Sequence, residues 1–284
     1  MITLDLVNLE KSQIKYKISQ FPDGQQTLDL TEYHDLNKYE DAIKISSRLN
    51  SFKDLELIIC AVQAIRNLKP NREIVLYVPY FVGARSDRKF VEGGVNYLKQ
   101  VICPIINSLN LTSVLVLDPH SDVLEACLNN YDKINNHTIV KHALIKIDNK
   151  NDAPQRTAIV SPDAGALKKI FDIAQKFGIE KVITAGKVRD MKTGKILKTE
   201  LPVTDWTGIQ QVVIIDDICD GGRTFTELSK AIRESGFTGK IYLIVTHGIF
   251  SAGFDTLNES FDGIFTTNSV KNIENPNLTQ FNVI

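Results

Sequence analysis

Short apolar runs alternate along the chain with longer stretches in which apolar residues recur every three or four positions. The runs are continuous rather than interrupted by polar residues, which is typical of strands buried on both faces of a parallel sheet. We predict a strand at each of them, over residues 74–78, 114–117, 182–183, 212–215 and 241–245.

The stretches between the runs have the periodicity of amphipathic helices. Within residues 54–68 the apolar positions fall on one helical face, at Leu55, Ile58, Val62 and Ile65. A second helix is predicted to open at Phe225 and to end near Ser235. This alternation of strand and helix predicts an α/β fold with mainly parallel sheets flanked by helices.

A polar tract over residues 135–155 is the best candidate for a linker or a domain edge. It divides the chain into two domains of comparable size, residues 1–138 and residues 139–284. Strands and helices are predicted to alternate in a similar way in both halves, which suggests that the halves share one fold. The last segment, residues 268–284, is placed either with the second domain or against the first.

Composition and charge narrow the class of protein. The 284 residues are 43% hydrophobic and 24% charged, with a net charge of −1. This balance argues against broad binding to nucleic acid or to acidic membranes, although it leaves room for a local basic pocket. We find no apolar run long enough to span a bilayer and no signal-peptide pattern, and we predict a cytoplasmic protein. The four cysteines show no CxxC spacing and are expected to be reduced thiols: Cys60, Cys103, Cys127 and Cys219.

The candidate chemistry is concentrated in the stretch VVIIDDICDGGRTF, residues 212–225. Three carboxylates follow a buried strand, at Asp216, Asp217 and Asp220. In open α/β sheets, ligands bind at the carboxyl ends of the strands. The next residues combine a glycine turn, a guanidinium and a hydroxyl ahead of a helix: Gly221, Gly222, Arg223 and Thr224. Such a turn can hold a phosphate on backbone N–H groups while the acids accept from sugar hydroxyls. A tight turn with solvated acids is the alternative.

This stretch resembles the loop that binds phosphoribosyl diphosphate (PRPP) in type I phosphoribosyltransferases and in ribose-phosphate pyrophosphokinases. The resemblance implies that Asp216 and Asp220 contact the ribose hydroxyls and that residues 221–224 hold the 5-phosphate. Pyrophosphokinases usually read Asp-Thr-Gly-Gly-Thr, whereas this chain reads Asp-Gly-Gly-Arg-Thr. Arg223 is therefore the more transferase-like choice.

Further landmarks resemble the pyrophosphokinases in the order of that family. Residues 78–89 resemble the segment that ends in Ala-Arg-Gln-Asp-Arg-Lys, which implies nucleotide-binding roles for Arg85, Ser86, Asp87 and Arg88. Ser86 replaces the usual glutamine, so one nucleotide contact of the family is changed. Three cations within five residues also suit a triphosphate better than a packed interior.

The resemblance also implies two metal ligands, His120 and Asp163. His120, in Leu-Asp-Pro-His-Ser, would lie near the ATP phosphates and could ligate a metal. Asp163, in Ser-Pro-Asp-Ala-Gly, would help to hold Mg²⁺ between ribose and ATP. Magnesium prefers few carboxylates completed by substrate oxygens, which suits a single aspartate at a strand end.

The segment from Gly186 resembles the family's mobile catalytic loop. There Lys187 and Arg189 would close over the transferring phosphate, and Arg88 would act with them to neutralise the charge that develops. Cations on a closing loop suit phosphoryl transfer, in which positioning and charge neutralisation supply most of the catalysis.

Residues 21–25 resemble a hairpin that reaches into the ATP site of a neighbouring subunit. Phe21 would stack on adenine, and Asp23 and Gln25 would accept hydrogen bonds from its amino group. The resemblance therefore implies a homo-oligomer with the ATP site at a subunit interface. Residues 246–251 match a further landmark, Thr-His-x-Ile-Phe-Ser.

Together these landmarks identify the chain as a member of the ribose-phosphate pyrophosphokinase family, with two tandem phosphoribosyltransferase-like domains. The implied reaction is Mg²⁺-dependent transfer of the β,γ-diphosphate of ATP to the C1 hydroxyl of ribose 5-phosphate, which gives PRPP and AMP. Three alternatives stay open. These are transfer to a larger 5-substituted ribose such as ADP-ribose, a phosphoribosyltransferase activity, and a non-catalytic regulatory homologue. Lys187 and Arg189 argue against the last.

Overall fold

The computed structural model describes residues 1–32, 42–162, 164–189 and 196–284. The chain divides into two compact units. The first consists of Met1–Asn135 with Val283–Ile284, and the second of Asn136–Asn282.

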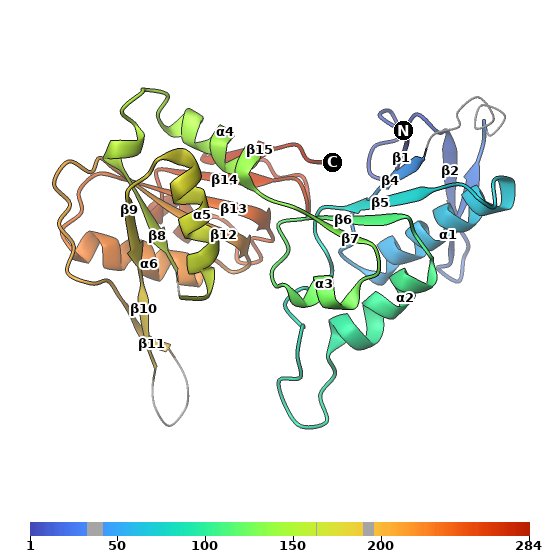
Figure 1. The fold of residues 1–284 in the computed structure, drawn as a ribbon, viewed down its shortest axis with the longest axis horizontal. Helices are drawn as coiled ribbons and strands as arrows, with labels where there is room; N and C mark the ends of the chain where they lie inside the picture. Colours follow the sequence, from blue (N-terminus) through green and yellow to red (C-terminus); the bar gives the residue numbers. More distant parts are fainter. Residues whose placement is uncertain (33–41, 163, 190–195) are drawn as a thin grey trace. The chain divides into compact units, whose positions relative to one another are not determined.

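The first unit is built on a five-stranded sheet in the order β1-β4-β5-β6-β7, in which all neighbouring strands are parallel (Figure 1). An antiparallel hairpin, β2–β3, is a separate two-stranded sheet. The elements are β1 Ile2–Asp5, β2 Tyr16–Gln20, β3 Gln26–Leu30, β4 Ile43–Ser46, α1 Phe52–Leu68, β5 Ile74–Val78, a π-helix Leu98–Ile102, α2 Cys103–Ser108, β6 Ser113–Leu117, α3 Val123–Cys127 and β7 Tyr131–Ile134.

Helix α1 begins at a capping box, in which Ser51 Oγ accepts from Asp54 N and the Asp54 carboxylate accepts from Ser51 N. The apolar face predicted for this helix packs on alternate residues of the strands, including Ile45 and Leu76, within one core. The intervening strand residues Val75 and Leu115 are only partly buried. Tyr77 and Leu117 are buried, so in this unit the strands are covered on the second face only in part.

The second unit contains a six-stranded parallel sheet in the order β15-β14-β13-β12-β8-β9. Its elements are α4 His137–Ile147, a 3₁₀ turn Pro154–Arg156, β8 Thr157–Ser161, a 3₁₀ turn Ala164–Ala166, α5 Leu167–Phe177, β9 Lys181–Thr184, β10 Gly186–Arg189, β11 Ile196–Glu200, β12 Gln211–Cys219, α6 Arg223–Glu234, β13 Lys240–Gly248, α7 Asp255–Ser260, β14 Gly263–Thr267 and β15 Leu278–Phe281.

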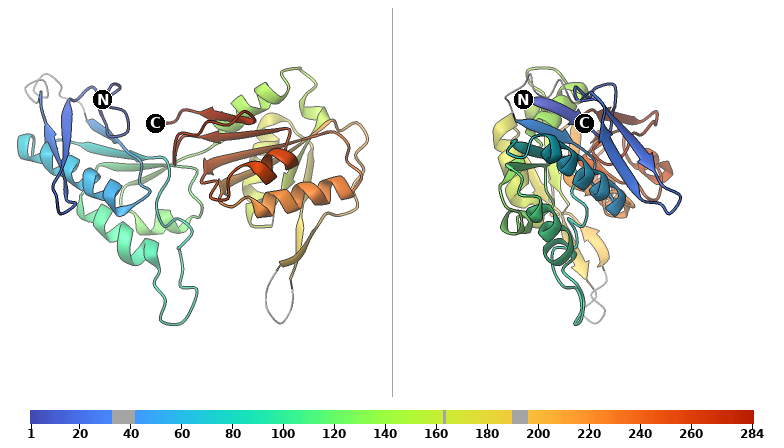
Figure 2. Two further views of the ribbon diagram at one scale, coloured as in Figure 1. Left: turned by 180° about the vertical axis from the view of Figure 1, so that it is seen from behind. Right: turned by 90° about the vertical axis from the view of Figure 1, so that its right-hand side faces the viewer.

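Helices flank this second sheet (Figure 2), and separate cores cover its two faces. Val212 and Ile214 pack in one core with residues of α6 and α7. Val213 and Ile215 pack in the other with residues of α4 and α5. Alternate residues of β12 thus enter opposite cores, which explains the continuous apolar run. The predicted α/β class, with mainly parallel sheets flanked by helices, is confirmed.

Three segments differ from the expectations. Residues 137–147 of the supposed linker form α4, because Ile139, Val140 and Ala143 are buried despite the polar setting. Strand β12 does not stop at Ile215 but continues through the aspartates to Cys219. The segment expected to be a loop after Gly186 begins and ends as a hairpin, β10–β11.

The end of the chain belongs largely to the second sheet. Residues 278–281 form β15, which pairs with β14 at the edge of that sheet, while Val283–Ile284 are grouped with the first unit. Among the residues described, no helix combines the length and the apolar character needed to cross a membrane.

Candidate functional site

The predicted ribose-phosphate loop lies where the strand order of the second sheet reverses. From β8 the chain moves to β9 on one side, and it then returns to β12 on the other side. Ligands of open α/β sheets bind at the carboxyl edge of such a switch point. Strand β12 pairs with β8 only as far as Ile214–Val160, but it continues beside β13 to Cys219–Gly248. Asp216 and Asp217 therefore extend beyond the end of β8.

Asp216 is an unusual carboxyl group. Burial, together with the hydrogen bond to the Asp217 side chain and the charge of that carboxylate, raises the pKa of Asp216 well above its usual range. The Asp217 N–H, which donates to Asp216 Oδ1 at 2.9 Å, and the charge of Lys169 act in the opposite direction. A carboxyl group held in such surroundings gains from a hydroxyl donor or a cation, and perturbed groups of this kind are common at functional sites.

A glycine turn follows the carboxylates. Gly222 has φ +80° and precedes α6, whose N–H groups at Phe225 and Thr226 donate to Gly222 O at 3.0 and 3.1 Å. The first helical N–H groups, at Arg223 and Thr224, have no intrahelical acceptor. The N-terminus of α6 therefore has the donors and the dipole to hold a phosphate.

The two polar side chains of this turn differ in their surroundings. Arg223 Nε donates to Glu227 Oε1 at 2.7 Å, and the Arg223 side chain is 86% exposed. The Thr224 hydroxyl makes no hydrogen bond to any residue that the structure describes. Binding an anion would therefore cost Arg223 its ion pair with Glu227, but would cost Thr224 no hydrogen bond to a described residue.

A second loop supports the first. After β13, the N–H groups of Ile249 and Phe250 donate to Cys219 O, at 2.8 and 3.2 Å. Phe250 has φ +47°, a left-handed conformation that is costly for a bulky residue.

Burial, with the charges of Asp216 and Asp220, raises the pKa of the Cys219 thiol to about 12, so this cysteine is a packing residue and not a nucleophile.

The other residues predicted for this half are described in part. Lys187 and Arg189 lie on β10, opposite Thr199 and Ile196 of β11. Their side chains, and the whole of Asp163, lie outside what the structure describes.

In the first unit, the predicted nucleotide-binding residues follow β5. Arg85 and Arg88 are exposed, while Ser86 and Asp87 are partly buried. The backbone here is fixed, because Ser86 O accepts from Leu98 N at 3.2 Å and Asp87 O accepts from the Asn96 side chain at 2.6 Å. The Arg88 guanidinium lies 5.5 Å from the centre of the Phe90 ring.

His120 follows the neighbouring strand, β6. It is exposed, and it comes two residues after Asp118, which is buried and has φ +44°. Leu117 N donates to Pro79 O at 3.2 Å, so the ends of β6 and β5 are joined. His120 and the arginine-bearing loop thus start from the same edge of the first sheet.

Magnesium fits the donor types of these residues. It usually takes one or two carboxylates and completes its shell with water and substrate phosphates. Across residues 1–32, 42–162, 164–189 and 196–284, no three His, Cys, Asp or Glu side chains converge to hold a metal by themselves. The assignment of His120 and Asp163 as ligands stays a prediction.

The predicted nucleotide hairpin is a β-hairpin in the structure, with residues 21–25 between β2 and β3. Phe21 N donates to Gln25 O at 2.8 Å, Gly24 has φ +95°, and Asp23 Oδ1 accepts from Gln25 N at 3.1 Å. The Phe21 ring is available at the tip, with 52% of the residue exposed.

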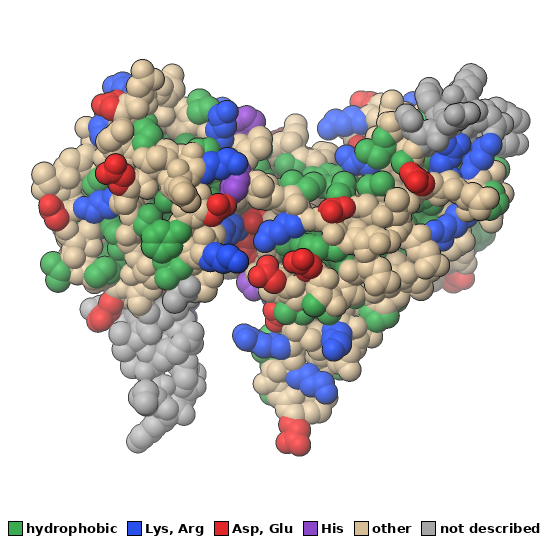
Figure 3. Space-filling model, viewed as in Figure 1, with side chains coloured by type: hydrophobic (Ala, Val, Ile, Leu, Met, Phe, Trp, Pro, Cys, Tyr) green, Lys and Arg blue, Asp and Glu red, His purple; other side chains and the backbone are tan. Residues whose placement is uncertain are grey.

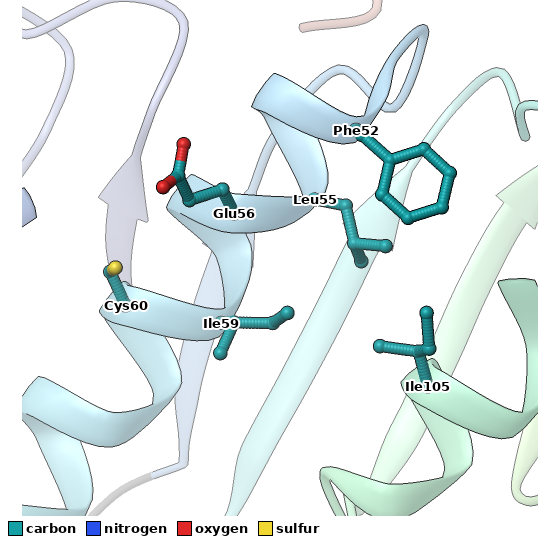
Figure 4. Close-up of a pocket in the computed structure, with 6 residues that line it drawn as sticks. All are labelled: Phe52, Leu55, Glu56, Ile59, Cys60 and Ile105. Carbon is teal, nitrogen blue, oxygen red and sulfur yellow. The ribbon is translucent and has the colours of Figure 1, made fainter. Parts of the chain in front are cut away.

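Two surface pockets lie away from these residues. One is an apolar pocket between α1 and α2, lined by Phe52, Leu55, Glu56, Ile59, Cys60 and Ile105 (Figure 4). The other is polar and lies between α6 and α7. On the face drawn in Figure 3, basic and acidic side chains are intermixed. Neither pocket contains a residue predicted for the site.

Comparison with known proteins decides the family. Residues 130–275, slightly more than half of the chain, match the phosphoribosyl transferase domain. The chain belongs to this family. The match includes the switch point, the carboxylates and the glycine turn described above.

Relatives of known name extend the likeness to nearly the whole chain. A ribose-phosphate pyrophosphokinase of Sulfurisphaera tokodaii is 24% identical over 267 residues, which cover 93% of this chain and 87% of that protein. A ribose-phosphate pyrophosphokinase of Thermoplasma volcanium is 27% identical over 254 residues, 89% of this chain and 82% of that protein. The predicted kinship with ribose-phosphate diphosphokinase-type transferases is confirmed.

A solved structure supports the fold. Phosphoribosylpyrophosphate synthetase from Mycobacterium smegmatis superposes with a TM-score of 0.77 at 17% identity, covering 97% of this chain and 88% of that one. The arrangement of two phosphoribosyltransferase-like halves is consistent with this likeness.

Three residues beside the predicted site were missed by the sequence analysis. Lys169 acts on Asp216 from α5, Ser251 contacts Asp220 from the loop after β13, and Arg48 lies two residues after the end of β4. Ser251 ends the landmark of residues 246–251, but its contact with Asp220 was not predicted, and neither Lys169 nor Arg48 belongs to a motif that we recognised.

Proposed function

We propose that the protein is a Mg²⁺-dependent pyrophosphokinase that transfers the β,γ-diphosphate of ATP to the C1 hydroxyl of ribose 5-phosphate, giving PRPP and AMP. The observation that carries the proposal is the combination of carboxylates and glycine turn at the β8/β12 switch point. The reaction type is taken from the named relatives. These are ribose-phosphate pyrophosphokinases, and the similarity covers most of their length.

Each residue has a defined task in this reaction. Asp216 and Asp220 accept from the ribose hydroxyls and fix the orientation of C1, which lowers the entropic cost of the encounter. Backbone N–H groups of residues 221–224 and the Thr224 hydroxyl hold the 5-phosphate. Asp217 keeps Asp216 in place through the backbone hydrogen bond of 2.9 Å.

The C1 oxygen attacks the β-phosphorus in line. A bond forms between that oxygen and Pβ, the bond from Pβ to the bridging oxygen of AMP breaks, and the hydroxyl proton leaves to solvent. Lys187, Arg189 and Arg88 neutralise the charge that develops on the phosphates. Bound Mg²⁺ would add charge neutralisation, and His120 and Asp163 are each a candidate ligand whose metal shell substrate oxygens would complete.

ATP is expected to bind through Arg85, Ser86, Asp87 and His120, with Phe21 of a neighbouring subunit stacked on the base. The exposure of Phe21 at a hairpin tip supports this arrangement. It requires a homo-oligomer. Sedimentation of dilute, active enzyme should therefore give a species larger than one chain, and a fully active monomer would contradict the interface site.

A larger acceptor such as ADP-ribose is a second candidate. A Cβ added at Gly221 would meet only Ser251 Oγ and Ala252 Cβ, at 3.9 and 4.0 Å, so the loop is open where the usual threonine is missing. The Arg223–Glu227 ion pair is exposed, and exposed pairs contribute only about 0–1 kcal/mol. An anionic acceptor could therefore recruit Arg223 at little cost.

One assay separates these possibilities. The protein is incubated with ATP and Mg²⁺ and with either ribose 5-phosphate or ADP-ribose, and AMP release is followed for wild type and Arg223→Gly. AMP release with ribose 5-phosphate supports the main proposal. If Arg223→Gly lowers kcat/KM only for ADP-ribose, the larger acceptor is supported. Absence of AMP release with both acceptors would point to a phosphoribosyltransferase or a regulatory homologue.

A further inference from the structure

Arg48 lies at the carboxyl edge of the first sheet, two residues after the end of β4. Strand β4 is the direct neighbour of β5, which leads into the loop that carries Arg85 and Arg88. The carboxyl ends of adjacent parallel strands share one edge, where ligands of such sheets bind.

The backbone on both sides of Arg48 is joined to the β5 side. Ser47 N donates to Tyr77 O at 3.0 Å, and Leu49 forms a parallel bridge with Phe81. Leu49 and Phe81 are both fully buried. Arg48 is thus fixed between two anchored residues, beside the start of the arginine-bearing loop.

The surroundings of Arg48 are costly for a cation. Burial lowers the pKa of this guanidinium, while the charge of Asp54 raises it. Asp54 is already engaged as the capping residue of α1. Its Oδ2 accepts from Asn50 N at 2.8 Å, from Ser51 N at 2.9 Å and from Ser51 Oγ at 3.1 Å. The Asp54 carboxylate therefore serves the helix cap as well as the charge of Arg48.

We propose that Arg48 is a further phosphate-binding residue of the nucleotide site, acting with Arg85 and Arg88 on the phosphates of ATP. The inference rests on the proposed function. An arginine at this position suits a polyphosphate, because its planar fork can bind two phosphate oxygens at once. A purely structural partner of the α1 cap is the competing role.

The test measures binding by titration calorimetry in the presence of Mg²⁺, with ATP and adenosine as ligands. Arg48→Gln should weaken ATP binding by at least tenfold and leave adenosine binding within about twofold, because adenosine lacks phosphates. Arg48→Lys keeps a charge without the fork and should fall between wild type and Arg48→Gln.

Arg66→Gln is the matched control. Arg66 belongs to the same unit, but its Nη2 donates to Asn110 O at 3.0 Å, and Asn110 precedes β6 at the opposite edge of the sheet. This variant loses the same charge and should bind ATP as wild type does. Thermal melting of all variants shows whether each one folds. If Arg48→Gln does not fold, Arg48→Lys carries the comparison.

The outcomes are distinct. Equal weakening of ATP and adenosine, or a change in ATP binding of less than twofold, would overturn the role of Arg48 and leave the proposed function intact. Wild-type protein that binds no ATP would overturn both. Selective loss of ATP binding in Arg48→Gln, with Arg66→Gln unchanged, supports the proposal.

Discussion

Ser251 Oγ donates a hydrogen bond of 2.6 Å to Asp220 Oδ1. Ser251 N also donates to Asp220 O, at 3.1 Å. One residue of the loop after β13 thus holds both the backbone and the carboxylate of an aspartate expected to bind ribose. The hydroxyl fixes the rotamer of Asp220 before any substrate arrives.

Ser251→Ala should therefore weaken binding of the ribose phosphate. The loss of one hydrogen bond to a partly exposed carboxylate is worth roughly 1 kcal/mol, or about fivefold in KM for the acceptor. KM for ATP should not change. Ser108→Ala removes an exposed hydroxyl that donates to Ile105 O in the first unit, and it serves as the control. Equal KM values for the acceptor in Ser251→Ala and wild type would show that Asp220 is held by other means.

Asp216→Asn should stabilise the free protein while it abolishes activity. The pKa of Asp216 is raised in the folded state, so its ionised form is disfavoured there. The free energy of unfolding should fall as pH rises from the unfolded pKa, about 4, through the raised folded pKa. The asparagine variant avoids this loss. We expect its Tm to exceed that of wild type by roughly 2–4 °C at neutral pH, and to match it near pH 4.

Asp205→Asn should change the Tm in the opposite direction. Hydrogen bonds from Thr207 lower the pKa of Asp205, so this carboxylate stabilises the fold above its unfolded pKa, and that stabilisation is lost as pH falls through the folded pKa. Its asparagine variant should have a slightly lower Tm than wild type at neutral pH. Thermal melts from pH 3 to 8 give both curves. A Tm of Asp216→Asn below that of wild type at pH 7 would contradict the destabilising effect assigned to ionised Asp216.

Gly222→Ala should damage the phosphate turn. Gly222 has φ +80°, and an added Cβ would lie 3.0 Å from Leu257 Cδ2. A left-handed alanine in a tight site costs about 1–3 kcal/mol. We expect a lower Tm and a higher KM for the acceptor.

Gly221→Ala is the control for this change, because an added Cβ there has open surroundings. Its Tm should equal that of wild type. If both alanine variants melt at the same temperature, the turn does not require glycine at position 222.

Lys187→Ala should lower turnover far more than ATP binding, because a cation that closes over the transferring phosphate acts on the transition state. We expect a loss in kcat of at least about tenfold, or roughly 1.4 kcal/mol. Steady-state kinetics with a parallel binding titration separate the two effects. Lys230→Ala, in an exposed pair with Glu234 on α6, is the control. A kcat within tenfold of wild type would remove Lys187 from the catalytic residues.

The elements that could be predicted are those with a strong local pattern. Strand β5 is the apolar run 74–78 itself, and α1 begins two residues before the predicted start, because Ser51 and Asp54 form the cap. The extension of β12 through Asp216 and Asp217 was missed. It depends on pairing with β13, which no apolar pattern reveals.

The residues of the site also divide into those that the sequence predicts and those that it does not. Asp216, Asp220 and the glycine turn lie within nine residues of sequence, so one stretch sufficed to predict them. Lys169, Ser251 and Arg48 come from other elements. The charge of Lys169 and the hydrogen bond of Ser251 operate only once the strands lie side by side, and therefore could not be predicted from local sequence.

The hydrogen bonds from residues 249–251 to Cys219 and Asp220 also bear on how this site could be altered or transplanted. The two loops hold each other in place, although Cys219 and Ile249 are 30 positions apart in the sequence. A graft of residues 216–224 alone into another scaffold would transfer the acids and the turn, but not the hydrogen bonds from residues 249–251 that hold them. Protein engineers who wish to exchange acceptor preference should therefore recombine both segments together, and random libraries should vary them as a linked pair.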